Sequence, residues 1–574
     1  AIGGLYGNDL YSSSATKDNA GNLTKNTQAS GEASIAMGVN TKATGKQALA
    51  MGADAQATKE AALAVGVNAV SNNGIAIGKN STSGGNSSSS IALGTNATSN
   101  FGGIAIGESA TANSQSIVIG AETRSGRATK AVIIGDGAGV GSAAGTNAPA
   151  DYSIAIGRNA GKLSEGKNTS HNLLNTIAIG ANSKIGDTNK KVSQSIAIGG
   201  ATDDNKTGGT WARGDQSIAI GSDVEATGDS SIAIGGDDLN SVYSSSSSYT
   251  KKTFDKAGTQ TSSQSVNKNL NDIYKDLTGR TEGLGYNVFK GTNSGQGAVA
   301  LGVKSKAGDI ALAIGTLSEA TGINSVAIGT GAQAPQANAV AIGGGSTTVG
   351  IQGRKVTDAD VTLADGTTMN YGGFAGAKNV EEGSMVSFGR ADRERQLKHI
   401  APGEISATST DAINGSQLYS VAKKLGDELK TTAEKPMYFK TDSPEEPTLS
   451  DTSSRKLGQT LEITGGAPKD DLTEGIANIG TYMDRYGNIH IGLSKNLSAL
   501  ATAQLSYPEP DGTLNPNKGY TTIDGKGLTI THVDGSGNEA PEISITSKGI
   551  DAGNTIIKNV APGAISKTST DAIN

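Results

Sequence analysis

Ser153–Gly157, with the sequence Ser-Ile-Ala-Ile-Gly, contains the four-residue pattern that decides the fold of this chain. An aliphatic residue, a residue that is small in most copies, a second aliphatic residue and Gly recur seventeen times, from Ile35–Gly38 to a last copy that ends at Gly343. The regular copies lie fourteen residues apart, as the glycines at positions 38, 52 and 66 do. A fixed period of this kind is the sequence signature of a repeat architecture.

Each copy of the pattern predicts one short β-strand. The order large, small, large places Ile75 and Ile77 on one face of a strand and Ala76 on the other. The Gly allows a corner, and a polar segment such as residues 223–228 then returns as a second strand. Two strands and two turns close one coil, so we expect a mainly β chain built as a parallel β-roll. Stacking places equivalent aliphatic residues above one another, and each buried Ile contributes about 1.5–3 kcal/mol.

The composition favours such a rod over an ordinary globular core. The chain has 574 residues with 81 Gly but only 12 Pro, and aromatic residues make up 4%. Gly does not recur at every third position, which excludes a collagen triple helix. Because one coil offers only about two large apolar residues, we infer that further copies of the chain cover one face of the roll. The order of that symmetry does not follow from the composition.

The spacing of the repeat widens in two places, which predicts inserted loops at 136–217 and a longer insertion at 236–297. The longer insertion contains a helical pattern formed by Val266, Leu270, Ile273 and Leu277. The loops at 136–217 come from successive coils, so we expect them to stack into one ledge that binds a receptor. Large or charged residues of the kind favoured in binding sites occur there. Our candidate receptor contacts are Trp211, Arg213, His171, Leu173 and Leu174. The alternative is that these residues only hold the loops against the roll or a neighbouring subunit.

Several functional classes lack support in the sequence. The formal net charge of −6 provides no attraction for nucleic acid or anionic lipid. Cys is absent, and no two of the four His residues have the spacing of metal ligands. Residues 161–167 imitate the start of a phosphate-binding loop, but Asn168 replaces the required Ser or Thr. No Gly-x-Ser-x-Gly nucleophile motif occurs. We therefore expect no enzyme, no cofactor and no metal site.

Segments that would direct the chain into or across a membrane are not found in this sequence either. No run of eighteen apolar residues occurs, and no basic segment leads into a short apolar one. We expect this part of the protein to make no direct contact with a membrane. The export signal and the membrane anchor are expected to lie outside this chain.

A different pattern follows the repeat. Residues 398–414 reappear at 558–574 with thirteen of seventeen positions identical, so one module type is used twice. After the first copy, Leu418, Val421, Leu425 and Leu429 are spaced by three or four residues. This spacing predicts a short coiled coil.

The head motif and the string Ser-Thr-Asp-Ala-Ile-Asn-Gly-Ser-Gln-Leu at 409–418 resemble trimeric autotransporter adhesins with YadA-like heads. These are type Vc secreted surface proteins of Gram-negative bacteria. The resemblance implies a left-handed parallel β-roll head in a side-by-side homotrimer, followed by a neck, a short coiled coil and small β-rich stalk modules. The absence of Cys fits a passenger that crosses the outer membrane unfolded. The resemblance places these residues in the trimer neck: Ile400, Ile405, Asp411, Ile413, Asn414 and Leu418.

On this basis we expect seven modules along the chain. They are a head at 1–350, a connector at 351–394, a neck at 395–420, a coiled coil at 421–435, two β-rich stalk modules at 436–500 and 501–556, and an incomplete second neck at 557–574.

The resemblance implies an adhesin at the bacterial cell surface, anchored in the outer membrane by a part not in this chain. Its ligand would be a host cell-surface receptor or an extracellular matrix protein. The alternative is a structural spacer within a longer trimeric fibre whose adhesive tip lies elsewhere. An ice-binding solenoid is less supported, because it would need flat arrays of Thr, and the corresponding positions here vary.

Overall fold

The chain divides into two compact units, Ala1–Ala412 and Ile413–Asn574, in a computed structural model that describes residues 27–568 with interruptions. The interruptions are 86–88, 127, 140–150, 162–172, 187–190, 201–208 and 285–290 in the first unit, and 441–442, 445–451, 462, 465–478, 484, 487–488, 494–501, 507–518, 534–538, 554–555 and 564–565 in the second.

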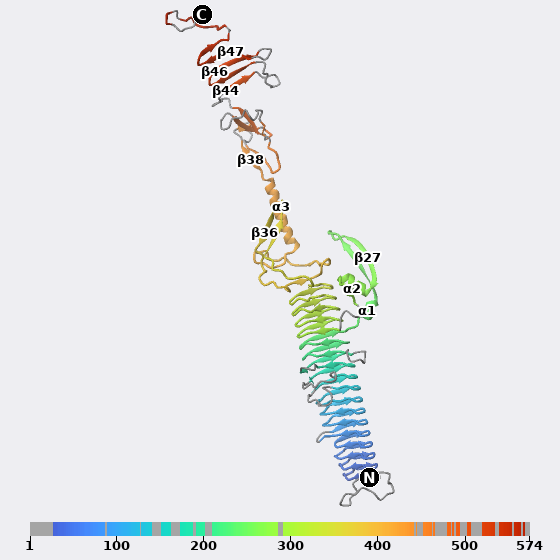
Figure 1. Cartoon of the computed structure of the whole chain (residues 1–574). Coiled ribbons are helices and arrows are strands. Elements are labelled where there is room, and N and C mark those ends of the chain that lie inside the picture. The colour runs from blue at the N-terminus through green and yellow to red at the C-terminus, as the bar shows by residue number, and fades with distance from the viewer. Residues whose placement is uncertain are drawn as a thin grey trace. The chain divides into compact units, whose positions relative to one another are not determined.

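The first unit contains a stack of short parallel strands, one from each copy of the repeat (Figure 1). Equivalent residues of successive coils pair with each other, as Ala36 does with Ala50 and Ala50 with Ala64. The predicted parallel β-roll is therefore confirmed. The main sheet consists of β2 (Ile35–Met37), β4 (Leu49–Met51), β6 (Leu63–Val65), β8 (Gly74–Ile77), β10 (Ser90–Leu93), β12 (Ile104–Ile106), β14 (Ile117–Ile119), β15 (Val132–Ile134), β16 (Ile154–Ile156), β18 (Ile177–Ile179), β21 (Ile196–Ile198), β23 (Ile218–Gly221), β25 (Ile232–Gly235), β29 (Val299–Leu301), β31 (Leu312–Ile314), β33 (Val326–Ile328), β34 (Val340–Ile342) and β37 (Val386–Ser387).

The polar segment of each coil forms the opposite side of the roll. These return strands are two residues long and pair in parallel in two sheets. One sheet contains β1 (Gln28–Ala29), β3 (Lys42–Ala43), β5 (Gln56–Ala57), β7 (Val70–Ser71), β9 (Thr82–Ser83), β11 (Thr98–Ser99) and β13 (Thr111–Ala112). The other contains β19 (Lys184–Ile185), β22 (Trp211–Ala212), β24 (Glu225–Ala226), β28 (Asn293–Ser294), β30 (Lys306–Ala307) and β32 (Glu319–Ala320). A separate pair is β17 (Leu173–Leu174) with β20 (Val192–Ser193).

Small residues fill the inside of the roll. The middle residue of all seventeen motif copies is at most 1% exposed, and it is Ala except at Val118 and Ile133. The aliphatic residues on either side point outward; Ile77, for example, is 39% exposed. The expectation that stacking buries these aliphatic residues within one chain is therefore wrong. The return strands also point small residues such as Ala43 inward, so the two sheets leave little room between them.

The motif glycines are required by both the backbone and the close stacking of coils. Gly52 has a φ of +126°, which side chains rarely adopt. A Cβ atom at this position would lie 2.5 Å from the carbonyl oxygen of Gly66 in the next coil. Gly therefore occupies this corner in each copy of the motif.

The long insertion contains α1 (Asn240–Ser244), β26 (Ser246–Phe254), β27 (Gln260–Asn269) and α2 (Leu270–Thr278), and we call residues 240–278 the arm. The strands β26 and β27 form an antiparallel hairpin, and α2 follows β27 directly (Figure 1). The predicted helix is shorter than its apolar pattern, because Val266 lies in β27. The side chain of Asn269 accepts a hydrogen bond of 2.8 Å from the backbone nitrogen of Asp272, and this cap sets the start of the helix.

The main sheet continues beyond the last copy of the motif. After a last return segment, in which Thr347 forms a parallel bridge with Gln333, the chain leaves the roll and forms a hairpin of β35 (Asp358–Thr362) and β36 (Thr368–Gly372). The chain then adds β37, in which Val386 pairs with Val340 of the last motif. The segment 351–394, expected as a connector, therefore contributes a strand to the roll.

The second unit begins with α3 (Gly415–Glu434). The strands that follow form three sheets. One pairs β38 (Met437–Lys440) with β40 (Thr452–Arg455); the next orders β39 (Ser443–Pro444), β42 (Ile479–Met483), β43 (Ile489–Leu493) and β41 (Ile463–Thr464); the last contains β44 (Thr502–Ser506), β45 (Tyr520–Asp524), β46 (Gly527–Val533), β47 (Glu539–Thr546) and β48 (Gly549–Asp551).

Candidate receptor-binding and neck surfaces

Trp211 lies on the outer face of the return sheet. It is the first residue of β22 and stands in register between Lys184 of β19 and Glu225 of β24. The indole nitrogen of Trp211 donates a 2.7 Å hydrogen bond to the carbonyl oxygen of Gly186. The expectation that Trp211 belongs to a protruding loop is therefore wrong, because its neighbour Ala212 is buried inside the roll like the other return-strand residues.

Two cations accompany the Trp211 ring. The guanidinium carbon of Arg213 lies 3.3 Å from the ring centroid, and the ammonium group of Lys184 lies 5.1 Å from it. Arg213 also forms an ion pair with Glu225. Burial, and then the charge of Arg213, lower the pKa of Lys184, whereas Asp223 acts in the opposite direction. The result is a half-buried aromatic ring among charged groups, an arrangement suited to cation–π and stacking contacts.

A signal in the sequence could have located this strand. Trp211-Ala212 precedes Glu225-Ala226 by fourteen residues, the period of the regular coils. In both pairs a large residue points outward and Ala points inward. The prediction from sequence groups this return strand with the long inserted loop that precedes it, and therefore misses the strand.

The other candidate contacts lie elsewhere. Leu173 belongs to β17, pairs with Val192 and is only 4% exposed, so its side chain is part of the core of this chain. Leu174 is half-buried on the same strand. His171 and much of the expected ledge, including 140–150, 162–172 and 201–208, lie outside the described residues. The described candidates thus lie on two different sheets, and Leu173 is not accessible to a ligand.

The neck residues of the first unit are mostly exposed. Ile405 is 69% exposed, while Ile400 is half-buried. Asp411 accepts a 3.0 Å hydrogen bond at its carboxylate from the backbone nitrogen of Glu404, which closes a local loop. A large aliphatic side chain that is this exposed in one chain is suited to a contact with another.

The neck residues of the second unit introduce α3. Asn414 caps the helix and forms a reciprocal pair of hydrogen bonds with Gln417. Ile413 is exposed, and so is the row of apolar residues along α3. This row consists of Leu418, Val421, Leu425 and Leu429. A helix that presents one apolar row with no packing partner among the described residues of its own chain has the pattern of a coiled-coil strand.

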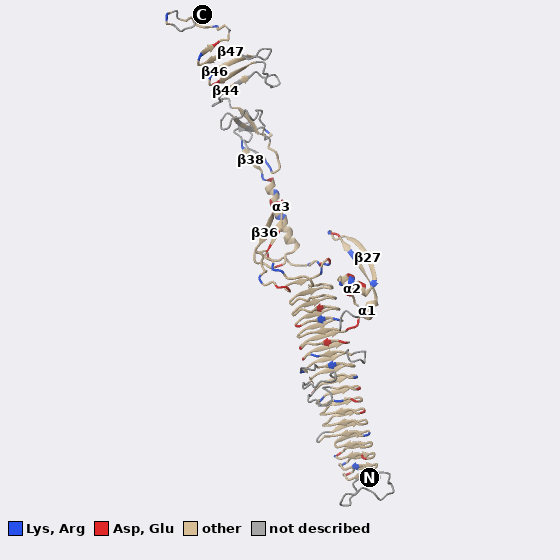
Figure 2. Cartoon of the chain, viewed as in Figure 1, with Lys and Arg blue, Asp and Glu red and all other residues tan. Residues whose placement is uncertain are grey.

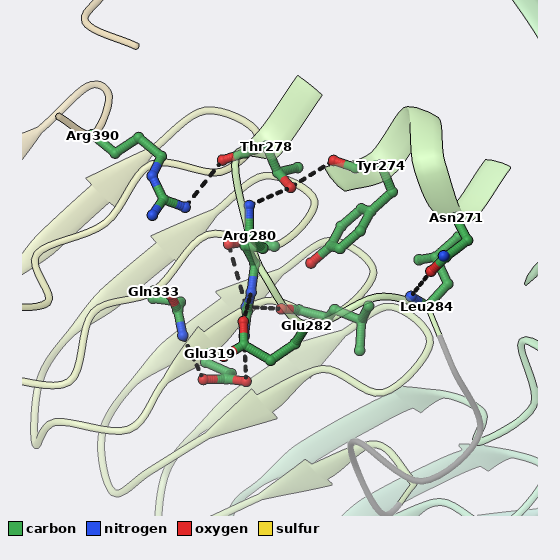
Figure 3. A network of polar contacts seen from close by, with 11 residues as sticks. Asn271, Tyr274, Thr278, Arg280, Glu282, Leu284, Glu319, Gln333 and Arg390 are labelled. Atoms are coloured by element: carbon green, nitrogen blue, oxygen red, sulfur yellow. Dashed lines mark hydrogen bonds and ion pairs between the residues drawn. The ribbon is translucent and has the colours of Figure 1, made fainter. Parts of the chain in front are cut away.

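A buried polar network that the sequence did not predict attaches the arm to the roll (Figure 3). Arg280 follows α2, is 5% exposed and forms an ion pair of 3.4 Å with Glu319 on the return strand β32. Arg280 forms a second ion pair of 3.4 Å with Glu282. From the connector, Arg390 donates a 3.3 Å hydrogen bond to the carbonyl oxygen of Thr278 at the end of α2. These contacts join segments that are far apart in the sequence, so no local sequence pattern predicts them.

The same attachment has an apolar part. Tyr274 of α2 is buried with Leu239, Leu284 and Leu317, and burial raises the pKa of its phenol. Together with the Arg280 network, this cluster fixes α2 against the roll.

No helix in the described residues is both long and apolar enough to span a membrane. Among the same residues, no group of three His, Asp or Glu side chains is arranged to hold a metal ion.

Two family models match the chain. The YadA head domain repeat matches residues 29–55, 43–69, 144–160, 208–223, 212–237, 308–332 and 320–346. The coiled stalk of trimeric autotransporter adhesin matches 396–435 and 557–574. The head matches fall on the coils of the roll, and the first stalk match contains α3.

Two curated proteins are similar in sequence. Autotransporter adhesin BtaE of Brucella suis biovar 1 (strain 1330) is 27% identical over 270 residues, which cover 46% of this chain and 26% of that protein. Autotransporter adhesin BadA of Bartonella henselae is 26% identical over 183 residues, covering 31% and 5%. The chain thus matches about a quarter of one relative and a twentieth of the other.

A solved structure, the C-terminal YadA-like domain of a Burkholderia pseudomallei protein, is 26% identical and covers 33% of this chain and 72% of that one, with a TM-score of 0.17. The fold assignment rests on the strand pairing described above and not on this likeness. The head repeats, the stalk segments and the two relatives together show that the chain contains YadA-type head and stalk domains, homologous to those of trimeric autotransporter adhesins.

Proposed function

We propose that this chain forms the head and part of the stalk of a homotrimeric adhesin that attaches bacteria to host cells or to the extracellular matrix. The observation that carries the proposal is the match of the head repeats to coils whose outward aliphatic rows are half-buried or exposed in one chain. Exposed apolar surface of this extent marks an interface, and neighbouring copies of the same chain would cover it. The role is mechanical and adhesive, not catalytic.

The module boundaries and the location belong to the same proposal. The head, connector, neck, coiled coil and stalk modules divide the chain at 350, 394, 420, 435, 500 and 556. The chain lies outside the cell, as part of a protein that is anchored in the outer membrane. Three copies of each binding surface on one rod gain avidity, because contacts made by one copy hold the others near their ligands.

The first test measures the oligomeric state of the 574-residue chain and its binding to host cells and matrix proteins. Light scattering is expected to give a mass near three times 57.5 kDa. The same sample is then applied to host cells and to immobilised matrix proteins, and it should bind at least one of them. A trimer that binds none of them contradicts adhesion by this part and favours a spacer in a longer fibre. A stable monomer contradicts the side-by-side architecture.

Within this proposal, Trp211 and Arg213 remain the candidate receptor contacts. Deleting 200–217 would remove β22 from the return sheet, so single substitutions test the site better. Trp211→Ala should reduce adhesion, whereas Trp211→Phe keeps a ring but loses the hydrogen bond to Gly186. Lys306→Ala changes another outward position of the same sheet and serves as the control. If Trp211→Ala lowers the melting temperature without changing adhesion, the ring only supports the roll.

A further inference from the structure

A groove lies between the hairpin β26–β27 and the helix α2, with one side closed by Arg393 from the connector. Its volume is about 470 Å³. Pockets that hold small ligands have volumes of roughly 300–1,000 Å³. The groove is therefore large enough for one or two sugar rings, and it lies away from the surfaces discussed above.

Alternate residues of the hairpin face this groove. Tyr249 pairs with Val266, and Lys251 pairs with Gln264, so these four side chains share one face of the two-stranded ribbon. All four line the groove. Lys252, the next residue, does not line it and belongs to the opposite face.

Polar contacts hold the walls of the groove together. The ammonium group of Lys268 at the end of β27 forms a 2.7 Å ion pair with the carboxylate of Asp276 on α2. The guanidinium group of Arg393 donates a hydrogen bond to the backbone carbonyl oxygen of Asp276. Because Arg280 and Arg390 fix the region around α2 to the roll, the hairpin and the helix form a supported site.

The groove is positively charged in a chain whose net charge is negative. Its lining contains three cations, Lys251, Lys268 and Arg393, against one carboxylate, Asp276. The hydrogen bond from Lys268 holds the pKa of Asp276 below its usual value, and the same contact raises the pKa of Lys268. Both groups therefore stay ionised at neutral pH, and the lining carries a net charge of +2 (3 − 1). Figure 2 shows both cationic and acidic residues along the hairpin and α2.

We propose that this groove binds an anionic saccharide, one bearing a carboxylate or a sulfate group. The cations supply charge-assisted hydrogen bonds to the acidic group. The side-chain amide of Gln264 supplies donors and an acceptor for sugar hydroxyls, and the half-buried ring of Tyr249 offers a flat apolar surface. The role of the groove as the recognition site of an adhesin rests on the proposed function. Binding of an anionic saccharide by the groove can be tested separately.

The experiment measures binding of the purified 574-residue chain to immobilised heparin, polygalacturonate and dextran by surface plasmon resonance. Heparin carries sulfate groups, polygalacturonate carries only carboxylates, and dextran is neutral. Binding to at least one anionic polymer and not to dextran is expected. The Lys251→Glu variant should weaken it about tenfold, the scale of losing one charge-assisted hydrogen bond.

The matched control is Lys252→Glu, which makes the same change of charge on the adjacent residue and the opposite face. It should leave the affinity within twofold. Equal losses in both variants would mean that the charge of the arm attracts polyanions without a groove, which overturns the proposal. No loss in Lys251→Glu, or no binding to either anionic polymer, also overturns it.

The outcome separates this inference from the proposed function. A chain that adheres to host cells but ignores all three polymers refutes the groove and leaves the adhesin intact. A chain that binds an anionic polymer through Lys251 but not cells or matrix keeps the groove and contradicts the adhesin.

Discussion

The roll and the arm obtain their order in opposite ways. In the roll, each coil repeats the contacts of its neighbours, as Ala313 of β31 does between Ala300 of β29 and Ala327 of β33. In the arm, α2 depends on contacts that occur once, chiefly the ion pair between Arg280 and Glu319. The comparison teaches that a solenoid can carry a differently built element if a few long-range polar contacts attach it. Stability in the roll is distributed over many coils, whereas in the arm it is concentrated.

The largest effect is expected in the roll. Gly52→Ala forces a side chain into a left-handed backbone conformation and against the carbonyl oxygen of Gly66. Strain of this kind costs about 1–3 kcal/mol, and the backbone contact adds to it. Thermal melting followed by far-UV circular dichroism should show a clear loss of stability.

Gly426→Ala is the control for that change. Gly426 lies inside α3 with no atom within 4 Å of an added Cβ, so the substitution should stabilise the helix by about 0.5–1 kcal/mol. Melting temperatures that fall equally in the two variants would contradict the argument from coil stacking.

A local effect, confined to the arm, is expected next. Arg280→Met removes one partner of a largely buried ion pair and leaves Glu319 without its cation, at a cost of about 3 kcal/mol. The arm should separate from the roll while the coils stay folded. Trypsin should then cut faster after Lys251 and Lys252, and the fluorescence melting curve of Trp211, the only Trp, should change little.

Lys423→Met serves as the reference for an exposed pair, since it removes an ion pair with Asp427 on the surface of α3. It should cost less than about 0.5 kcal/mol. If Arg280→Met shifts the Trp211 melting curve as far as it speeds cleavage of the arm, the roll and the arm are one cooperative unit and the contrast fails.

The sequence predicts the roll well and the arm poorly for the same reason. Local alternation and a fourteen-residue period place the strands, but they do not say which face is inside. Which face points inward depends on the small volume between the two sheets. That volume holds the methyl group of Ala76, whereas the larger side chain of Ile77 points outward. In the arm, the apolar spacing from Val266 to Leu277 predicts a longer helix, because the cap at Asn269 and the pairing of Val266 with Tyr249 are not visible in that spacing.

The candidate site divides in the same way. The outward position of Trp211 follows from the period once its equivalence to Glu225 is recognised. The groove of the arm does not follow, since it joins residues of the hairpin to Asp276 and to Arg393, more than a hundred positions later. Only folding brings such residues together, so no spacing rule finds them.

The smallest effect sharpens the comparison at the groove itself. Asp276→Asn removes the exposed ion pair with Lys268 and should change the stability of the chain little near neutral pH. The pKa of Asp276 is depressed in the folded chain, so the contribution of the pair is complete above the ordinary Asp value of 3.8 and is lost as the pH falls through the lower folded value. The measurement is the rate at which pepsin cleaves the arm at pH 2.5 and at pH 4.5. Pepsin is chosen because it is active in acid, whereas trypsin would require a return to pH 8, at which the ion pair forms again. The wild-type arm should lose more protection at pH 2.5, relative to pH 4.5, than the Asp276→Asn arm does, because only the wild type has a carboxylate at position 276 to protonate. Identical losses would mean that the groove keeps its walls together without this pair, leaving Arg393 and the pairing of β26 with β27 as the contacts that shape it.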